Sequence, residues 1–254
     1  SISKYWYGKY LASFFDKLLF ISLKNVSLIL ATGDEIAIDE MIERSRNSIK
    51  KESVVPFPTR INTEIFKPCN KLDARIRLNI PSGVPIIVST GRLSWYKGWK
   101  FMIDCFSVYE KGKPGSLFYL IGEGEDLQAI EEYIDVSNLK GKINLVGKQD
   151  INRVALYLNA ADLFIMGSYK EGWSTSLCEA IACGIPACVT NFSSAKSIII
   201  DGKNGFVIDD HSIELFTQGM QNAAKIALPI DNDNVKAYAV TKLRAELLKK
   251  WQLI

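Results

Sequence analysis

Two glutamates stand eight positions apart in the segment EGWSTSLCEA, at Glu171 and Glu179. Three hydroxyl residues lie between them, and Ser174, Thr175 or Ser176 can cap a helix that follows. We place Glu171 in the loop before that helix, where a carboxylate can accept hydrogen bonds from vicinal hydroxyls of a sugar; the alternative is a solvated acid. Glu179 would lie within the helix and face a ribose, or form a capping box with Ser176. Spacing alone leaves both pairs of alternatives open.

Two cations lie in the turn TGRLSWYKG, after a strand predicted over 85–90. Arg92 and Lys97 suit a pyrophosphate, because a guanidinium forks onto two oxygens and an ammonium supplies a point charge. Taken alone, the turn favours the simpler alternative of two solvated loop cations. The helix predicted to begin near residue 174 would add free N–H groups and a partial positive charge, which also favour an anion.

Two glycines, Gly122 and Gly124, follow the strand predicted over 117–121 in the segment IGEGED. They could let a backbone approach a ligand closely. The third glycine of the dinucleotide fingerprint is missing here. A dehydrogenase would need the whole fingerprint after the first strand, where GRLSWYKG does not match it, so that class is disfavoured.

From residue 71 onward, short apolar strands alternate with helical patterns. Strict alternation indicates an α/β domain with a doubly wound parallel sheet that is covered on both faces. Ligands of such sheets bind outside the carboxyl ends of the strands, so the segments above should meet at one edge. We expect strands over 85–90, 117–121, 143–147, 162–166, 185–190 and 205–208, and helices over 98–112, 125–136, 150–160, 174–183 and 194–200.

The first part of the chain has a different pattern. Residues 5–21 carry apolar side chains at helical spacing, and we expect this amphipathic helix to pack on a core rather than lie on a membrane surface. Short strands over 26–30 and 53–57 flank a helix over 33–49. Prolines then punctuate a linker over 58–70.

The composition excludes several classes of protein. The chain has 254 residues, 48% of them hydrophobic, which is enough for the core of one or two domains. The net charge of +3 is too small to indicate nucleic acid. Five cysteines without a CxxC pair argue against a disulfide framework or a zinc site and favour a reducing compartment. We expect Cys178, Cys183 and Cys188 to be small buried residues on a helix and the following strand. We expect the only histidine, His211, at the surface.

Four motifs occur in order: GRLSWYKG, LIGEGE, AADLFIMGSYKEGWSTSLCEAIACGIPACVT and IIIDGKNGFVID. Together they resemble glycosyltransferase family 4, whose members are retaining nucleotide-sugar transferases of the GT-B fold, with two Rossmann-like domains. The similarity runs from about Val54 to Asp210, and VVPFPTRINTEIFKP resembles the family's interdomain segment. The pair Glu171 and Glu179 is its most specific element.

The resemblance implies a role for each matching position. Arg92 and Lys97 would neutralise the donor pyrophosphate and, with Glu171 at the donor sugar, would be the catalytic residues. Glu179 would bind the ribose, and the loop after 146–148 would touch the base. The scheme needs no protein nucleophile, metal or cofactor, because the leaving diphosphate helps the acceptor to lose its proton. The other substrate-binding positions would be Gly91, Gly122, Gly147, Lys148, Gly172, Trp173, Ser174, Thr175 and Ser176.

The resemblance also implies how the chain is divided. Residues 1–57 would be a remnant of the acceptor-side domain, 58–70 a linker, 71–232 the donor-binding domain and 233–254 a terminal helix that crosses back. Most of the acceptor-side domain would be absent, so we expect the chain to bind a UDP- or GDP-sugar and to turn over poorly alone.

The expected setting is the synthesis of polysaccharide, lipopolysaccharide or glycolipid. The partners would then be a nucleotide-sugar donor and a saccharide or lipid-linked acceptor. The expected location is the cytoplasm, with peripheral membrane contact through residues 5–21 as an open question. A non-catalytic nucleotide-sugar-binding module, or a partner subunit, is the alternative function.

Overall fold

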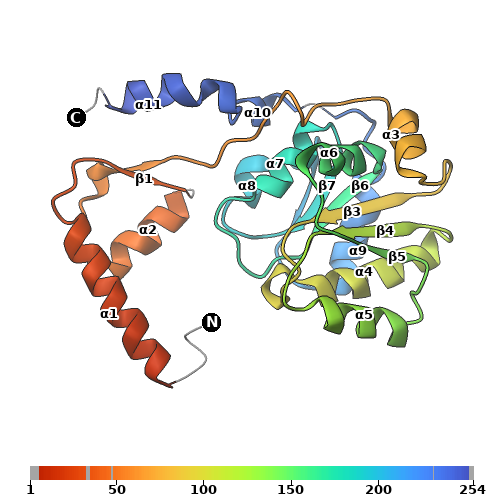
Figure 1. Ribbon diagram of the computed structural model, residues 1–254, viewed down its shortest axis with the longest axis horizontal. Helices are drawn as coiled ribbons and strands as arrows, with labels where there is room; N and C mark the ends of the chain where they lie inside the picture. The colour runs from red at the N-terminus through yellow and green to blue at the C-terminus, as the bar shows by residue number, and fades with distance from the viewer. Residues whose placement is uncertain (1–5, 33–34, 47, 231, 252–254) are drawn as a thin grey trace. The chain divides into compact units, whose positions relative to one another are not determined.

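The computed structural model describes residues 6–32, 35–46, 48–230 and 232–251, and the chain divides into two compact units (Figure 1). The smaller unit comprises residues 1–59 together with 244–254, and the larger comprises residues 60–243.

The prediction of a single terminal helix over 233–254 is wrong. The segment contains α10 (Asp233–Lys236), the 3-10 turn η4 (Val240–Lys242) and α11 (Leu243–Trp251). Ile61 lies between the two halves of the break: its N–H donates to the carbonyl of Tyr238, and its carbonyl accepts from the N–H of Val240, both at 2.9 Å. These bonds fix the backbone in a bridge, and a helix cannot continue through it.

The larger unit is built on a parallel sheet of six strands in the order β5-β4-β3-β6-β7-β8. This confirms the predicted α/β class with a doubly wound sheet. The winding reverses between β3 and β6, so the switch point of the sheet lies at the carboxyl ends of these two strands. The strands are β3 (Ile86–Thr90), β4 (Leu117–Ile121), β5 (Ile143–Gly147), β6 (Leu163–Met166), β7 (Ala187–Thr190) and β8 (Gly205–Ile208).

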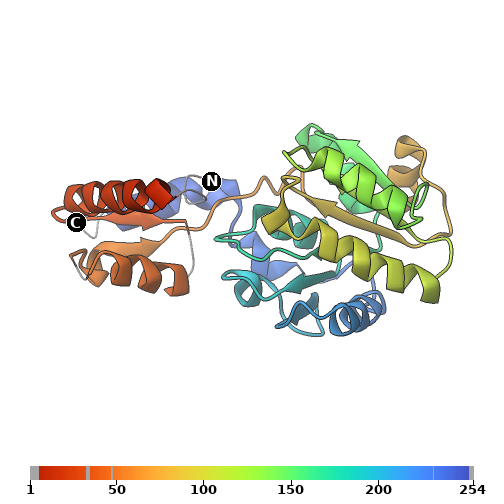
Figure 2. The same ribbon diagram turned by 90° about the horizontal axis from the view of Figure 1, so that it is seen from below.

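Helices cover both faces of this sheet (Figures 1 and 2). Successive strand residues point to opposite faces, so Ile86 and Val88 join one hydrophobic cluster and Ile87 joins the other. One face carries α3 (Lys71–Leu78), α6 (Ile151–Ala160), α7 (Thr175–Ala182) and α8 (Ala195–Ile198); the other carries α4 (Trp99–Gly112), α5 (Leu127–Val136) and α9 (Ile213–Ala223).

Two of these helices were not expected from the sequence. α3 buries only Ala74 and Arg75, so it has almost no apolar stripe to detect. α9 does carry a signal, because Phe216, Met220 and Ala223 recur at helical spacing and are fully buried.

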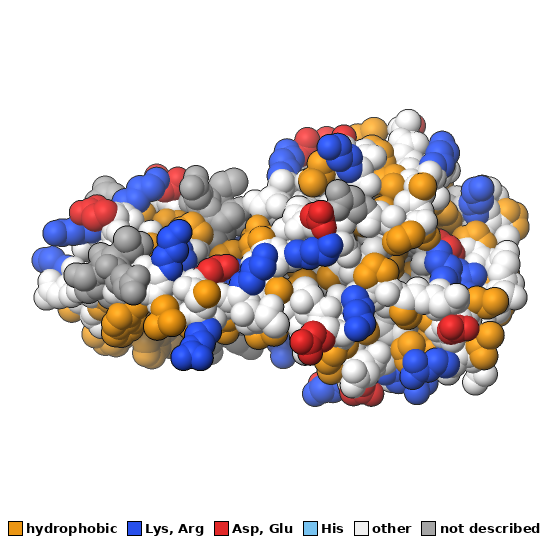
Figure 3. Space-filling model, turned by 90° about the horizontal axis from the view of Figure 1, so that it is seen from above, with side chains coloured by type: hydrophobic (Ala, Val, Ile, Leu, Met, Phe, Trp, Pro, Cys, Tyr) orange, Lys and Arg blue, Asp and Glu red, His pale blue; other side chains and the backbone are white. Residues whose placement is uncertain are grey.

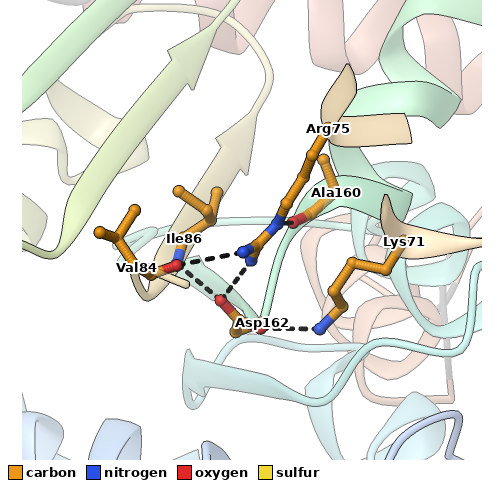
Figure 4. Close-up of polar contacts among 6 residues, drawn as sticks. All are labelled: Lys71, Arg75, Val84, Ile86, Ala160 and Asp162. Carbon is orange, nitrogen blue, oxygen red and sulfur yellow. Dashed lines mark hydrogen bonds and ion pairs between the residues drawn. The ribbon is translucent and has the colours of Figure 1, made fainter. Parts of the chain in front are cut away.

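Asp162 ties α3 to the amino-terminal edge of the sheet (Figure 4). Its carboxylate pairs with Lys71 and with Arg75 at 2.7 Å each, and accepts the N–H of Ile86 at 2.7 Å. Arg75 also donates to the carbonyl of Ala160 at 2.9 Å. This network lies at the opposite edge of the sheet from the switch point, so its role is structural.

The smaller unit contains a two-stranded parallel sheet, in which Ile29 of β1 (Ile29–Ala31) lies opposite Val54 of β2 (Val54–Pro56). The helices α1 (Trp6–Leu23) and α2 (Glu35–Arg44) and the 3-10 turn η2 (Lys51–Ser53) complete it, with α11 from the end of the chain. Its small core consists of Phe20, Ile38, Ile49 and Val54.

The helix expected over 5–21 is present as α1, and for the side chains described its apolar face packs on no core within this chain. Phe20 is the buried residue of this helix, while the predicted apolar stripe is exposed. The side chain of Tyr7, which belongs to the same predicted stripe, lies outside the described residues. None of the described helices has the length and apolar character needed to cross a membrane. The exposed stripe comprises Tyr10, Leu11, Phe14, Phe15, Leu18 and Leu19.

All five cysteines are free, and only Cys69 is exposed. Burial raises the pKa of the Cys178 thiol to about 12, as expected for a small core residue rather than a nucleophile. On the face drawn in Figure 3, Lys and Arg side chains are interspersed with Asp and Glu side chains. This surface has no single basic stripe of the kind that follows a nucleic acid backbone.

Candidate functional site

The segments that carry the predicted site residues meet at the carboxyl ends of β3, β4, β5 and β6. A cavity of about 560 Å³ opens there, at the switch point of the sheet. We call it the switch-point cavity. Its walls come from the ends of three strands and from α6 and α7, and they include six of the predicted site residues: Gly91, Arg92, Gly122, Lys148, Ser176 and Glu179.

Gly122 allows the loop after β4 to lie close against the loop after β3. A Cβ at this position would lie 1.8 Å from the carbonyl oxygen of Gly91. The same loops are joined by a hydrogen bond from the N–H of Leu93 to the carbonyl of Glu123, at 2.9 Å. The missing side chains of Gly122 and Gly124 therefore make room for the neighbouring loop, whereas the sequence suggested a close approach of this backbone to a ligand.

Arg92 is an exposed cation in the wall of the cavity. It forms no ion pair with any residue that the structure describes, and it lines both the switch-point cavity and a smaller adjoining one that also contains Lys97. A guanidinium placed in this way can offer its full fork of donors to an anion.

Thr90 was not singled out from the sequence. It is the last residue of β3, it lines both cavities, and its buried Oγ1 has no hydrogen-bond partner among the described residues. Buried polar atoms are normally satisfied, so an unpaired hydroxyl at a cavity wall is a donor held ready for a ligand or water. The signal in the sequence is its position as the last residue of the central strand.

Lys97 and Glu171, which were given separate roles, contact each other. Lys97 lies in the 3-10 turn η3 (Trp95–Lys97) and Glu171 in the loop after β6; the Lys97 ammonium pairs with Oε1 of Glu171. The hydroxyl of Ser168 lies 3.3 Å from the same oxygen. The two side chains are only 24% and 11% exposed, so the pair is a fixed part of the site.

Gly98 allows the η3 turn and the loop after β6 to come together. It has a φ of +69°, and a Cβ there would lie 1.8 Å from the carbonyl oxygen of Gly167. The N–H of Tyr169 donates to the carbonyl of Tyr96 at 2.9 Å, which joins the loops a second time. The contact between Lys97 and Glu171 therefore depends on close backbone packing.

We expect Gly98→Ala to destabilise the protein by about 3 kcal/mol, since a left-handed Ala costs about 1–2 kcal/mol and the clash with Gly167 adds a comparable amount. The matched control is Gly202→Ala, at a φ of +71° with nothing within 4 Å of the added Cβ. It should cost about 1 kcal/mol. Urea denaturation of both variants measures the difference, and equal losses would contradict the proposed close packing.

Ser174 is the residue that caps α7. Its side chain accepts from the N–H of Leu177 at 3.3 Å, and its own N–H donates to Ser194 at 3.1 Å. The capping-box alternative for Ser176 and Glu179 is therefore wrong, because the cap lies two residues earlier. The backbone N–H groups of Thr175 and Ser176 find no acceptor in the described part of the chain, so they remain available at the helix N-terminus.

Glu179 faces the switch-point cavity from inside α7. Burial raises the pKa of its carboxyl from 4.5 to about 7. No described residue donates a hydrogen bond to it. A half-buried carboxyl without a partner among the described residues, in the wall of a cavity, marks a binding or catalytic position rather than a stabilising one.

The remaining predicted residues divide between the cavity and the core. Lys148 lines the cavity, where its ammonium pairs with Glu123 at 2.9 Å. Gly147 ends β5, and its carbonyl accepts the N–H of Gly122 at 3.0 Å. Trp173 packs edge-on against Tyr238, with ring centroids 4.6 Å apart.

Trp173 therefore lines neither of the two cavities described above, although its neighbour Gly172 is exposed. The described residues contain no group of three or more His, Cys, Asp or Glu side chains that could hold a metal ion.

The family model described as "Glycosyl transferases group 1" matches residues 70–239, which is the part of the chain that forms the sheet and both cavities. A lipopolysaccharide core biosynthesis glycosyltransferase of Rhizobium meliloti, LpsE, is 27% identical over 147 residues. The match covers 58% of this chain and 42% of that relative, so the chain spans less than half of the relative's length.

Two solved structures have a similar fold. The sucrose-phosphate synthase of Thermosynechococcus elongatus superposes with a TM-score of 0.77 at 22% identity, over 94% of this chain and 61% of that protein. HepE of Anabaena, solved in complex with UDP and glucose, superposes with a TM-score of 0.72 at 17% identity, over 90% of this chain and 63% of HepE. At these identities the likeness shows the fold alone, which is the Rossmann-like fold of GT-B glycosyltransferases.

Proposed function

Since this chain belongs to the family of glycosyl transferases group 1, we propose that it binds a nucleotide-diphosphate sugar and serves its transfer, with retention, to a saccharide or lipid-linked acceptor. This is the activity of glycosyltransferase family 4. The observation that carries the proposal is the switch-point cavity, where the Arg92 guanidinium, the first turn of α7 and the Glu179 carboxyl line one volume.

The diphosphate would lie against Arg92 and the first turn of α7. A diphosphate needs several charge-assisted donors, and Arg92 has a fork without an ion-pair partner among the described residues. The N–H groups of Thr175 and Ser176 add donors and the partial positive charge of a helix N-terminus. In the transfer step negative charge develops on the leaving diphosphate, and donors fixed in advance stabilise that charge.

The nucleoside would extend toward α6 and β5. The Glu179 carboxyl would accept hydrogen bonds from the ribose hydroxyls, which would supply the partner that it lacks among the described residues. The base would lie near Lys148 and Gln149, which line the same cavity. The complex of HepE with UDP and glucose supports a uridine donor as the first to test.

The donor sugar would lie at the pair of Lys97 and Glu171. The carboxylate of Glu171 would accept hydrogen bonds from sugar hydroxyls, while Lys97 holds it in place and adds positive charge near the diphosphate. The name of the Rhizobium meliloti relative supports lipopolysaccharide or related glycan synthesis as the setting. The chain spans less than half of that relative, so we expect donor binding with weak turnover by the chain alone.

The test is calorimetric titration of the chain with UDP, GDP and ADP. We expect one nucleotide to bind, and Arg92→Ala combined with Lys97→Ala to weaken it about 100-fold, because two charge-assisted contacts are lost at about 1.5 kcal/mol each. Lys196→Ala is the matched control, because Lys196 is an exposed cation paired with Asp209 and lines neither cavity. The absence of binding to all three nucleotides, or an equal loss in the control, would contradict the proposal.

A further inference from the structure

Two exposed aromatic rings lie on the same two loops as the pair of Lys97 and Glu171, and a third ring joins them from the segment after β8. Trp95 is 69% exposed and Tyr169 is 53% exposed, and their ring centroids are 6.3 Å apart at an angle of 35°. The exposed His211 stacks on Tyr169, with centroids 4.1 Å apart and an angle of 8°. We call these three residues the aromatic row. Neither the donor site nor the core uses the exposed rings of Trp95 and Tyr169.

The row is held rigidly from beneath. The backbone of Tyr169 is bonded to that of Tyr96 at 2.9 Å. Nε2 of His211 lies 3.3 Å from the carbonyl oxygen of Gly167. Below it, the ring of Phe101 lies 5.0 Å from that of His211 and belongs to the core of the unit. Exposed rings on a fixed backbone lose little conformational freedom when a ligand packs on them.

Trp95 and Tyr169 lie on the two loops that carry the sugar end of the proposed donor. Along this edge of the sheet, Glu179 and Lys148 line the switch-point cavity, Arg92 lines both cavities, and Lys97 lines only the smaller one. Trp95 precedes Lys97 by two residues, and Tyr169 precedes Glu171 by two residues. A donor that runs from Glu179 to Glu171 therefore ends next to the row.

The chemistry of the row suits a saccharide. A pyranose ring has a face of C–H groups, which packs on a flat aromatic ring, and a rim of hydroxyls that stay in water or bond to polar groups. Trp95 offers an exposed ring, and Tyr169 offers the ring face that His211 does not cover; both carry a polar tip, as an amphipathic ligand requires. A nucleic acid strand would also stack on such rings, but it needs a basic groove along its backbone, and the ion pair beside the row carries no net charge.

We propose that Trp95 and Tyr169, backed by His211, form the subsite for the acceptor saccharide. This inference rests on the proposed function, because the row is an acceptor site only if the sugar donor lies at Glu171. It assigns acceptor recognition in part to the larger unit, through contacts made on the C–H face of a hexose.

The experiment is saturation-transfer difference NMR on the full 254-residue chain with saturating UDP. The probes are maltotriose, triacetylchitotriose and mannotriose. We expect saturation of the axial C–H protons of at least one probe, and a fall of about fivefold or more when Trp95→Ala and Tyr169→Ala are combined. Both side chains are largely exposed, so the variant should fold. Trp251→Ala, which removes a 73% exposed aromatic ring from the smaller unit, is the control and should leave the signal unchanged.

UDP binding to the same samples, measured by calorimetry, separates the two proposals. Retained UDP affinity with lost saccharide signal in the double variant supports the subsite. UDP binding without a signal from any probe, or with a signal that the double variant leaves intact, overturns the subsite and leaves the donor site standing. A saccharide signal that depends on Trp95 and Tyr169, without binding of any nucleotide, overturns the donor site and leaves a saccharide-binding row.

Discussion

Replacing Asp162 with alanine should destabilise the protein by about 3 kcal/mol, the largest loss that we expect from a single polar side chain. Removing one member of a buried ion pair leaves its partner charged and unpaired, which typically costs about 3–5 kcal/mol. Here the partner is Arg75, whose side chain is 7% exposed. The N–H of Ile86 also loses its acceptor at 2.7 Å. The exposure of Asp162, at 33%, lets water compensate in part and places the estimate at the low end.

Two further variants isolate the cause of this loss. Asp162→Asn keeps an oxygen for the Ile86 N–H and removes only the charge, so it should cost about half as much. Asp209→Ala breaks the exposed pair with Lys196 and should change the free energy of unfolding by less than about 1 kcal/mol. Guanidinium denaturation at pH 7 measures all three variants. A loss at Asp162 no greater than that at Asp209 would show that the network contributes little to the fold.

Replacing Glu179 with glutamine should make the protein more stable at pH 8, by on the order of 2 kcal/mol, and should leave it almost unchanged at pH 4.5. Burial raises the pKa of this carboxyl from 4.5 to about 7, so the fold favours its protonated form. The stability that protonation contributes is fully present below the unfolded pKa and is lost as the pH rises through about 4.5–7. Above that range the wild type carries a half-buried charge without a partner among the described residues, which glutamine avoids. The full shift corresponds to about 3 kcal/mol, and partial access of water reduces it.

The measurement is the free energy of unfolding at several values between pH 4.5 and pH 8 for the wild type and Glu179→Gln. Glu131→Gln, at an exposed position on α5, is the matched control and should give a curve parallel to that of the wild type. Curves for the wild type and Glu179→Gln that stay parallel would contradict the raised pKa. A gain in stability would show that Glu179 is kept at a cost to the fold, as is common for groups that serve binding.

Local sequence determined most of the sheet. The segments over 117–121, 143–147 and 205–208 form strands with the predicted boundaries, since each is a short apolar run bounded by turn residues. The helices predicted over 98–112 and 150–160 begin one residue later than expected, at Trp99 and Ile151. The strict alternation of these elements was enough to give the parallel, doubly wound architecture, because parallel neighbours need crossover helices.

The sequence pattern also predicted that the site residues lie at one edge of the sheet, because every segment that follows a parallel strand begins at the same edge. Arg92, Glu179 and Lys148 accordingly line one cavity. The sequence pattern did not determine the direction in which each side chain points. Trp173 was expected beside a sugar and packs on Tyr238, a residue 65 positions away that the C-terminal segment brings to the core.

The sequence by itself therefore determined the fold class, the strands and the edge at which the candidate site forms, because these depend on patterns within a few residues. Only the tertiary structure decided that Lys97 pairs with Glu171, that the half-buried Glu179 has no partner among the described residues, and that Gly98 admits the backbone of Gly167. It also decided that Trp95, Tyr169 and His211 form one row. The reason is physical: ion pairing, desolvation and close backbone contact act through space, between loops that the strand order brings together.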